Sequence, residues 1–152
     1  MRSTLWRSVV VLVAVVLMGA ACSSNKSGTT TGGSPGASSS ESGGGTITIG
    51  NDTANNHGSK DVSGASSVDV EQDDFYFNPT IITGTPGQKL TVTLKNEGST
   101  THNFTLEDQN IDQDVSPGSD ATVTVTFPQS GTLEFYCKFH RSQGMVGELS
   151  VS

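Results

Sequence analysis

The segment YCKFHRSQGMVG, residues 136–147, decides how the rest of this chain is interpreted. It holds Cys137, His140 and Met145, so a thiol is followed by an imidazole after two residues and by a thioether after four more. A second imidazole, His102, lies upstream in STTHNFTL, residues 99–106. Two imidazoles and a thiolate in one plane, with a long axial thioether, are the ligands of a mononuclear blue copper site. Soft sulfur favours Cu(I) and imidazole holds Cu(II), so this set suits a metal that changes oxidation state.

The strands on either side of these ligands predict where the metal lies. Residues two apart in a strand share a face. Cys137 is in phase with the apolar Phe135, and His102 is in phase with Phe104. Both ligands are therefore expected on inward faces at strand ends, beneath one end of a β-sheet structure. The other two ligands come from the loop that follows Cys137.

Short alternating segments and turn residues fill the chain from Val68 onward. Examples of the alternation are LTVTL (90–94), ATVTVTF (121–127) and TLEF (132–135). Turns are predicted at TPGQ (85–88), NEG (96–98), SPG (116–118) and PQSG (128–131). Because no segment shows a helical period, the sequence predicts an all-β fold, either a β-sandwich or a small barrel.

The first 21 residues have the features of an export signal. Arg2 and Arg7 precede an apolar run over residues 9–18 that is too short to span a membrane comfortably. The small residues before Cys22 resemble a bacterial lipobox, which predicts a lipoprotein signal peptide over residues 1–21 and lipidation of Cys22. The alternative is an ordinary signal peptide and a secreted protein. The chain is thus expected outside the cytoplasm, anchored to the cell membrane through a lipid.

Residues 22–66 are predicted to be a flexible tether, because Gly, Ser and Thr dominate them and cannot form a core. Within this range TITIG (46–50) alternates like a strand, and the sequence leaves open whether it joins the domain. His57 lies among small polar residues, so it is expected to be a surface histidine of the linker rather than a ligand. The folded domain is predicted to occupy residues 67–152.

The charge balance limits the class of partner. The formal charge is −7, and without Arg2 and Arg7 the chain keeps six basic and 15 acidic residues, or −9. Such a protein is a poor candidate for binding nucleic acid. The predicted domain carries a group of acidic residues that serves either as a solvated face or as a docking surface. They are Asp69, Glu71, Asp73, Asp74, Glu107, Asp108, Asp112 and Asp114.

The cysteine count gives an independent argument for a metal. The chain has two cysteines, so lipidation of Cys22 leaves Cys137 without a disulfide partner. A lone thiol in an exported protein is either a small buried core residue or a reactive or ligating group. The positions of His140 and Met145 directly after Cys137 favour metal ligation.

These residues resemble the cupredoxins, the type 1 blue copper proteins, and within them the plastocyanin-like group. The resemblance covers about residues 68–152 and rests on an early His-Asn pair, the Cys-x2-His-x4-Met spacing, GTLEFYC and MVGELSV. It implies a Greek-key β-sandwich or barrel holding one copper ion that cycles between Cu(II) and Cu(I). His102, Cys137 and His140 would be equatorial ligands and Met145 the axial one. Asn103 would tie the two ligand loops together.

The chain departs from plastocyanins beside the copper ligands. Lys138 and Phe139 stand where those proteins usually have a small residue and proline, and Arg141 adds a second positive charge. The resemblance implies docking through an apolar patch around the edge of His140. The basic neighbours therefore leave the partner open, and no photosynthetic role is carried over.

Three functions are compatible with these ligands or with the fold. The first is a monomeric electron carrier that docks transiently with membrane-associated or extracytoplasmic redox proteins at the outer face of the cytoplasmic membrane. The alternative is an extracytoplasmic copper-binding protein for copper delivery, storage or resistance, although Met145 is the only methionine after the signal segment. The third is an immunoglobulin-like binding module without metal.

Catalysis is not expected. Multicopper oxidases and copper nitrite reductases need further histidine ligands, whereas this chain has three histidines, one of them in the predicted tether. A dinuclear copper centre of the oxidase type needs a second cysteine four positions after the first, and that position is Arg141. A Cys-His protease needs a substrate cleft and a group that orients the histidine, and the predicted β-domain suggests neither.

Overall fold

The computed structural model describes residues 44–152. The predicted signal peptide, the predicted lipidation site Cys22 and residues 22–43 of the predicted tether lie outside the described residues. Within residues 44–152, no helix is both long enough and apolar enough to cross a membrane.

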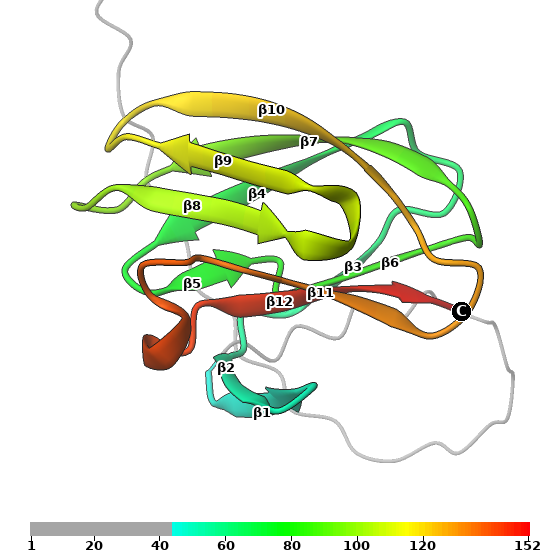
Figure 1. The fold of residues 1–152 in the computed structure, drawn as a ribbon, viewed down its shortest axis with the longest axis horizontal. Coiled ribbons are helices and arrows are strands. Elements are labelled where there is room, and N and C mark those ends of the chain that lie inside the picture. The colour runs from blue at the N-terminus through cyan, green and yellow to red at the C-terminus, as the bar shows by residue number, and fades with distance from the viewer. Residues whose placement is uncertain (1–43) are drawn as a thin grey trace, which may run out of the picture. The chain divides into compact units, whose positions relative to one another are not determined.

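Two β-sheets form the domain, which confirms the all-β prediction (Figure 1). The four-stranded sheet has the order β10 (Asp120–Thr126), β7 (Lys89–Asn96), β4 (Ser67–Asp73) and β5 (Tyr76–Asn78). The six-stranded sheet has the order β3 (Ser59–Asp61), β6 (Ile81–Gly84), β12 (Val146–Val151), β11 (Thr132–Tyr136), β8 (His102–Leu106) and β9 (Ile111–Val115). A separate hairpin joins β1 (Thr46–Ile49) to β2 (Asp52–Asn55). Two single 3₁₀ turns, η1 (Glu107–Gln109) and η2 (Arg141–Gln143), complete the described part.

Strand β7 shows why the alternating segments become a sandwich. Its residues Leu90, Val92 and Leu94 are fully buried, while the threonines between them point away from the core. Val92 lies opposite Val123 of the antiparallel β10 and opposite Val68 of the parallel β4. Matching apolar faces in neighbouring strands fix this register, since a shift by one residue would turn every apolar side chain outward.

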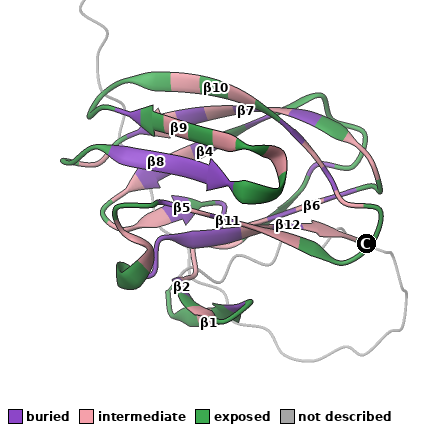
Figure 2. Cartoon of the chain, viewed as in Figure 1, coloured by how far each residue is buried: buried purple, intermediate pink, exposed green. Residues whose placement is uncertain are grey.

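Figure 2 shows buried positions along strands of both sheets, and three phenylalanines are among the largest fully buried side chains. Phe135 of β11 stacks on Phe104 of β8 with ring centroids 4.8 Å apart, and the edge of Phe77 meets both rings. All three are fully buried, and each contributes about 1.5–3 kcal/mol through burial of its apolar surface. Because Phe104 and Phe135 each lie two residues from a predicted ligand, this packing fixes the strands that carry the site.

Strand β8 is buried on both faces. The inward phase of His102, Phe104 and Leu106 is as predicted, but Asn103 and Thr105 on the other face are buried too. Thr105 donates its hydroxyl hydrogen bond to Asn103 Oδ1 at 2.6 Å. Hydrogen bonds between side chains therefore satisfy the buried polar groups on this face. The alternation of apolar residues in the sequence does not predict such burial.

The described strands begin at Thr46, upstream of the expected boundary at residue 67. β3 pairs in parallel with β6, and the β1–β2 hairpin buries Ile49 and Ala54 against Val146 of β12. The predicted tether residues 46–66 thus belong to the domain. Their polar composition concealed three short strands, which join the domain through backbone pairing and a small apolar cluster.

His57 is also part of the domain rather than a linker histidine. Its ring stacks on that of Tyr76, with centroids 3.4 Å apart and the planes 8° from parallel. Its backbone N–H donates to Thr80 Oγ1 at 2.7 Å. Among residues 44–152, the candidate metal cluster consists of His102, Cys137 and His140 and does not include His57.

Candidate metal centre

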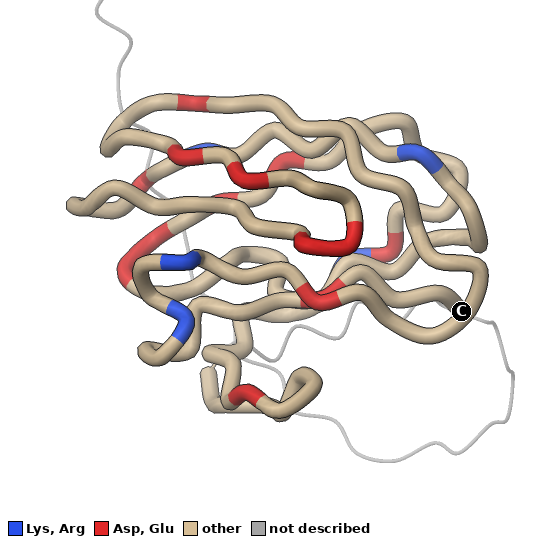
Figure 3. Tube along the Cα trace, viewed as in Figure 1, with Lys and Arg blue, Asp and Glu red and all other residues tan. Residues whose placement is uncertain are grey.

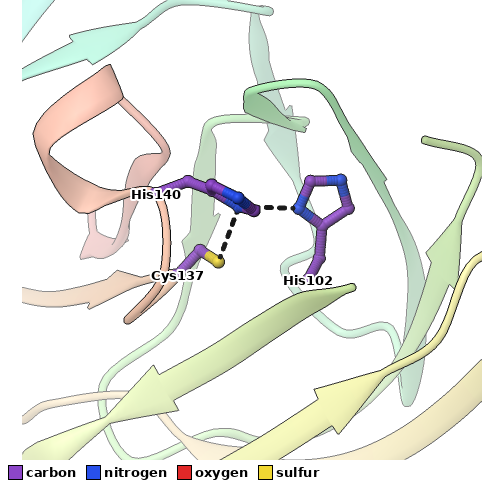
Figure 4. A group of neighbouring side chains, drawn as sticks. All are labelled: His102, Cys137 and His140. Atoms are coloured by element: carbon purple, nitrogen blue, oxygen red, sulfur yellow. Dashed lines mark hydrogen bonds between the residues drawn. The ribbon is translucent and has the colours of Figure 1, made fainter. Parts of the chain in front are cut away.

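Three of the predicted ligands lie side by side in the structure (Figure 4). One ligand atom each from His102, Cys137 and His140 lies within 4.8 Å of the other two. The Nδ1 atoms of the two imidazoles are 3.2 Å apart, and Cys137 Sγ is 3.4 Å from His140 Nδ1. Both histidines therefore turn the same ring nitrogen toward the sulfur, and the three donors surround one point.

The backbone of residues 137–145 folds into a closed loop that carries three of the predicted ligands. The N–H of Cys137 donates to the carbonyl oxygen of Met145 at 3.0 Å, and the N–H of Met145 donates to that of His140 at 3.2 Å. The N–H of His140 donates to the carbonyl oxygen of Cys137 at 3.0 Å. Gly144, with φ +90°, provides the left-handed turn that lets the chain return after η2.

Met145 lies in this loop and is fully buried in the same core cluster as Cys137. Its backbone is thus bonded to the two other ligands of the loop. The role of its sulfur as the axial ligand remains a prediction.

The hairpin β1–β2 holds the ligand loop from outside. Asn55 Nδ2 donates to the carbonyl oxygens of Gln143 at 2.8 Å and of Phe75 at 2.9 Å, and the Asn55 N–H donates to the carbonyl oxygen of Gly144 at 2.9 Å. A Cβ atom at Gly144 would lie 2.8 Å from Asn55 Nδ2, so glycine is also needed for this close approach. Phe75 in turn packs on His140, with ring centroids 4.5 Å apart.

Asn103 connects the two ligand segments. Its Oδ1 accepts a hydrogen bond from the backbone N–H of Lys138 at 3.3 Å, directly after Cys137. Its Nδ2 donates to Asp112 and Asp114 of β9, at 2.7 Å each. The geometry is that expected of a residue that ties β8 to the loop after β11, and such outer contacts orient metal ligands.

The positive charges beside the ligands are neutralised by acidic residues. Lys138 Nζ lies 2.7 Å from Asp112 and 2.8 Å from Asp114, both on β9, where Figure 3 shows acidic positions. Arg141 Nη2 lies 2.8 Å from Asp52 and 2.5 Å from Glu134. Each cation has two carboxylate partners, so the positive charge beside the ligand loop is balanced locally. Among the predicted acidic group, Asp112 and Asp114 pair with Lys138, and Asp69 pairs with Lys95.

Burial sets the protonation states of the donors. Burial raises the pKa of the Cys137 thiol, although backbone N–H groups of Phe139, His140 and Asn103 that point at the sulfur oppose this effect. Burial lowers the pKa of His102, as does the charge of His140, and Asp74 opposes both; burial also lowers the pKa of His140. Neutral imidazole is the form that binds a metal, whereas the thiol must lose its proton. Burial therefore favours the neutral, metal-binding form of both imidazoles, whereas the Cys137 thiol loses its proton when a metal binds.

Asp74 is a contact of the site that sequence patterns did not reveal. Its Oδ1 lies 3.0 Å from Nε2 of His102, on the side of the ring away from Cys137. In the sequence Asp74 belongs to an acidic run, EQDD, without any ligand-like spacing. Asn55 also has no ligand-like spacing, and it lies in the segment that resembles a linker. Both contacts come from segments far apart in the sequence.

One thiol and two imidazoles around one point fit copper. Residues 46–151 match the family model of the cupredoxin-like domain. Plastocyanin A/B of Petroselinum crispum is 30% identical over 86 residues, covering 50% of this chain and 87% of that protein. Plastocyanin of Sambucus nigra is 30% identical over 90 residues, with the same two shares. Among solved structures, auracyanin A of Chloroflexus aurantiacus has a TM-score of 0.49 and 19% identity, over 57% of this chain and 98% of that one.

The family match spans most of the described domain and includes every ligand of the cluster. The cofactor is one copper ion, for which His102, Cys137 and His140 are the candidate ligands. The chain therefore belongs to the cupredoxins and is a plastocyanin-like blue copper protein.

Proposed function

We propose that this protein is a mobile electron carrier, anchored through a lipid on Cys22 at the outer face of the cytoplasmic membrane. The observation that carries the copper role is the meeting of His102, Cys137 and His140 within 4.8 Å. A buried thiolate and two fixed imidazoles allow copper to change between Cu(II) and Cu(I) with little rearrangement. The protein adjusts the reduction potential of copper through its ligands, through the N–H groups at the Cys137 sulfur and through burial of the site.

Electrons are proposed to pass through His140. His102 is fully buried, whereas His140 is only partly buried and follows Phe139, the one large apolar side chain exposed within residues 44–152, at 48%. The rings of Phe139 and His140 have centroids 6.2 Å apart. An apolar side chain beside the accessible ligand suits brief contact with another redox protein, since such encounters use small interfaces.

The partners are proposed to be membrane-associated or extracytoplasmic redox proteins, reached by a monomeric carrier on a tether. Support comes from the signal-like residues 1–21, the small residues before Cys22 and the Ser- and Gly-rich segment after it. Replacing Cys22 with Ser tests the anchor. The full chain is expected in the membrane fraction, and the Cys22→Ser variant is expected in the soluble extracytoplasmic fraction. Equal partition of both would refute lipid anchoring.

The copper role is tested by the visible spectrum of the domain beginning at residue 44, after Cu(II) is added. We expect an intense blue colour from charge transfer between Cys137 and copper, which a mild reductant bleaches reversibly. Cys137→Ala is expected to fold and stay colourless. Asn51→Ala, in the exposed turn between β1 and β2, is the control and should stay blue.

Two other outcomes would overturn the electron-carrier proposal. A folded domain that binds copper without blue colour and yields it readily to a chelator would favour copper delivery or storage. A folded domain that binds no copper would leave a binding module. The proposed role includes no catalysis at a second copper, which fits a chain whose one further histidine, His57, stacks on Tyr76.

A further inference from the structure

We propose that Asp74 is a positioning residue that fixes the His102 ring and favours Cu(II) over Cu(I), which lowers the reduction potential. This inference rests on the proposed copper function. His102 has two ring nitrogens, and the structure separates their tasks. Nδ1 faces His140 and the metal point, whereas Nε2 lies 3.0 Å from Asp74 Oδ1.

Other hydrogen bonds hold the Asp74 carboxylate in place. The Ser99 N–H donates to Oδ2 at 3.1 Å, the Ser99 hydroxyl donates to the same oxygen, and the Thr100 hydroxyl donates to Oδ1 at 3.2 Å. These donors stabilise the ionised form of the Asp74 carboxyl group. The Asp74 side chain is 26% exposed, and that of His102 is 0% exposed. A fixed carboxylate thus meets a fully buried imidazole.

Gly98 gives a second, independent sign that this contact is built into the fold. A Cβ atom at position 98 would lie 2.6 Å from His102 Nε2 and 2.7 Å from Asp74 Oδ1. The φ of Gly98 is not in the left-handed region, so the backbone conformation does not require glycine here. Glycine is needed at position 98 because a side chain there would clash with the Asp74 carboxylate and the His102 ring.

The contact has two consequences for copper. A carboxylate accepts a hydrogen bond only from a protonated nitrogen, so Asp74 holds the proton on Nε2 and leaves the Nδ1 lone pair free for the metal. The negative charge behind the ring also makes His102 a stronger donor. Cu(II) carries one more positive charge than Cu(I), so a nearby fixed anion stabilises Cu(II) more. The carboxylate therefore lowers the potential and sets the orientation through one hydrogen bond.

The test compares Asp74→Asn and Asp74→Ala with the control Asp73→Asn in the copper-loaded domain. Asp73 is the adjacent carboxylate, and its side-chain bonds go to the N–H of Asp74 and the hydroxyl of Tyr76 rather than to His102. Loss of an outer partner typically weakens metal binding by about 10–100-fold. If only Cu(II) binding weakens, each tenfold loss raises the one-electron potential by about 59 mV.

We expect a higher reduction potential in both Asp74 variants and a much smaller change in Asp73→Asn. Asp74→Asn keeps an acceptor for Nε2–H and removes the charge, so it isolates the electrostatic part. A potential in Asp74→Asn equal to that of Asp73→Asn, in blue and folded proteins, would overturn the role of the charge and leave the proposed function intact. Urea unfolding of each variant checks that the domain has folded.

The His102 tautomer supplies a readout that needs no copper. Long-range ¹H–¹⁵N spectra of the metal-free wild type are expected to show the proton on Nε2. Asp74→Ala is expected to give a mixture of tautomers, and so is Gly98→Ala, whose methyl group separates the two side chains. An unchanged tautomer in both variants would refute the positioning role. If the wild type never turns blue, the proposed function fails first, and this measurement still decides whether Asp74 fixes the ring.

Discussion

The side-chain amide of Asn55 donates a 2.8 Å hydrogen bond to the carbonyl oxygen of Gln143, which lies 88 positions later in the chain. The same amide also bonds to Phe75, whose ring packs on His140. The Asn55 side chain thus holds the ligand loop directly at Gln143 and supports Phe75, which packs on His140. The N-terminal hairpin is therefore a structural part of the metal centre.

Replacing Asn55 with Ala is expected to loosen this loop. Two backbone carbonyl groups lose their side-chain donor, which should lower the free energy of unfolding by about 1–3 kcal/mol. Copper should also be lost faster to a chelator, because the residues around His140 become more mobile. Urea unfolding and the decay of the blue colour in excess chelator measure the two effects. Asn51→Ala, with its exposed side chain in the same hairpin, is the matched control, and equal behaviour of the two variants would contradict the fastening role.

Replacing Met145 with Leu tests the axial ligand. The two side chains are similar in volume, so the core should tolerate the change at a cost below about 1.5 kcal/mol. Leucine replaces a polarizable donor on the long axial side with an apolar group, which disfavours the more highly charged Cu(II) ion, so the potential should rise while the blue colour persists. Voltammetry of the copper-loaded domain measures the shift. An unchanged potential would show that the Met145 sulfur does not contact the metal.

Acid should weaken the domain through Asp112 and Asp114. The Lys138 ammonium group, followed by the Asn103 amide, holds the pKa of both carboxyl groups below the usual value. Because the folded-state pKa is lowered, their contribution to stability is complete above about pH 4, the ordinary Asp pKa, and is lost as the pH falls through the folded-state values.

The variant Lys138→Met should raise the pKa of both carboxyl groups and flatten the loss of stability below pH 4. Carboxyl NMR titration and urea midpoints of the metal-free domain at pH 6 and pH 3 report these changes. Lys60→Met, on the short strand β3, is the control. If Lys138→Met lost stability with acid as steeply as Lys60→Met, the ion pairs would not be the cause.

Phe139 is expected to govern electron transfer without affecting the copper. Phe139→Glu places a charge beside His140 and should slow electron self-exchange between the Cu(I) and Cu(II) proteins, because two like charges must approach each other. Phe139→Leu keeps the apolar surface and should exchange at close to the wild-type rate. NMR line broadening in mixtures of the two redox states measures the rate, with the visible spectrum as a check on the site. Equal rates in both variants would place the electron exit elsewhere.

The fold and the ligand cluster could be predicted because their signals are local. Alternation over residues 90–94 and 121–127 defines strands, and the spacing Cys137-x2-His140 follows from a single loop. The contacts that support the site could not be predicted in this way. Asp74 reaches His102, and Asn55 reaches Gln143, only after the sheets have assembled. Neither residue belongs to a periodic pattern or a spaced motif. Local composition therefore assigned Asp74 to an acidic surface and Asn55 to a linker.

The short strand β3 has a consequence for how the molecule behaves in solution. Residues Ser59–Asp61 occupy one edge of the six-stranded sheet, are all exposed, and include Lys60. Short, charged edges discourage strands of other molecules from pairing with a sheet. A chain shortened to begin at Ser67 would instead expose the backbone of β6, whose apolar Ile81 and Ile82 would offer an open template for intermolecular pairing. The segment that resembles a linker thus covers a sheet edge that would otherwise be open.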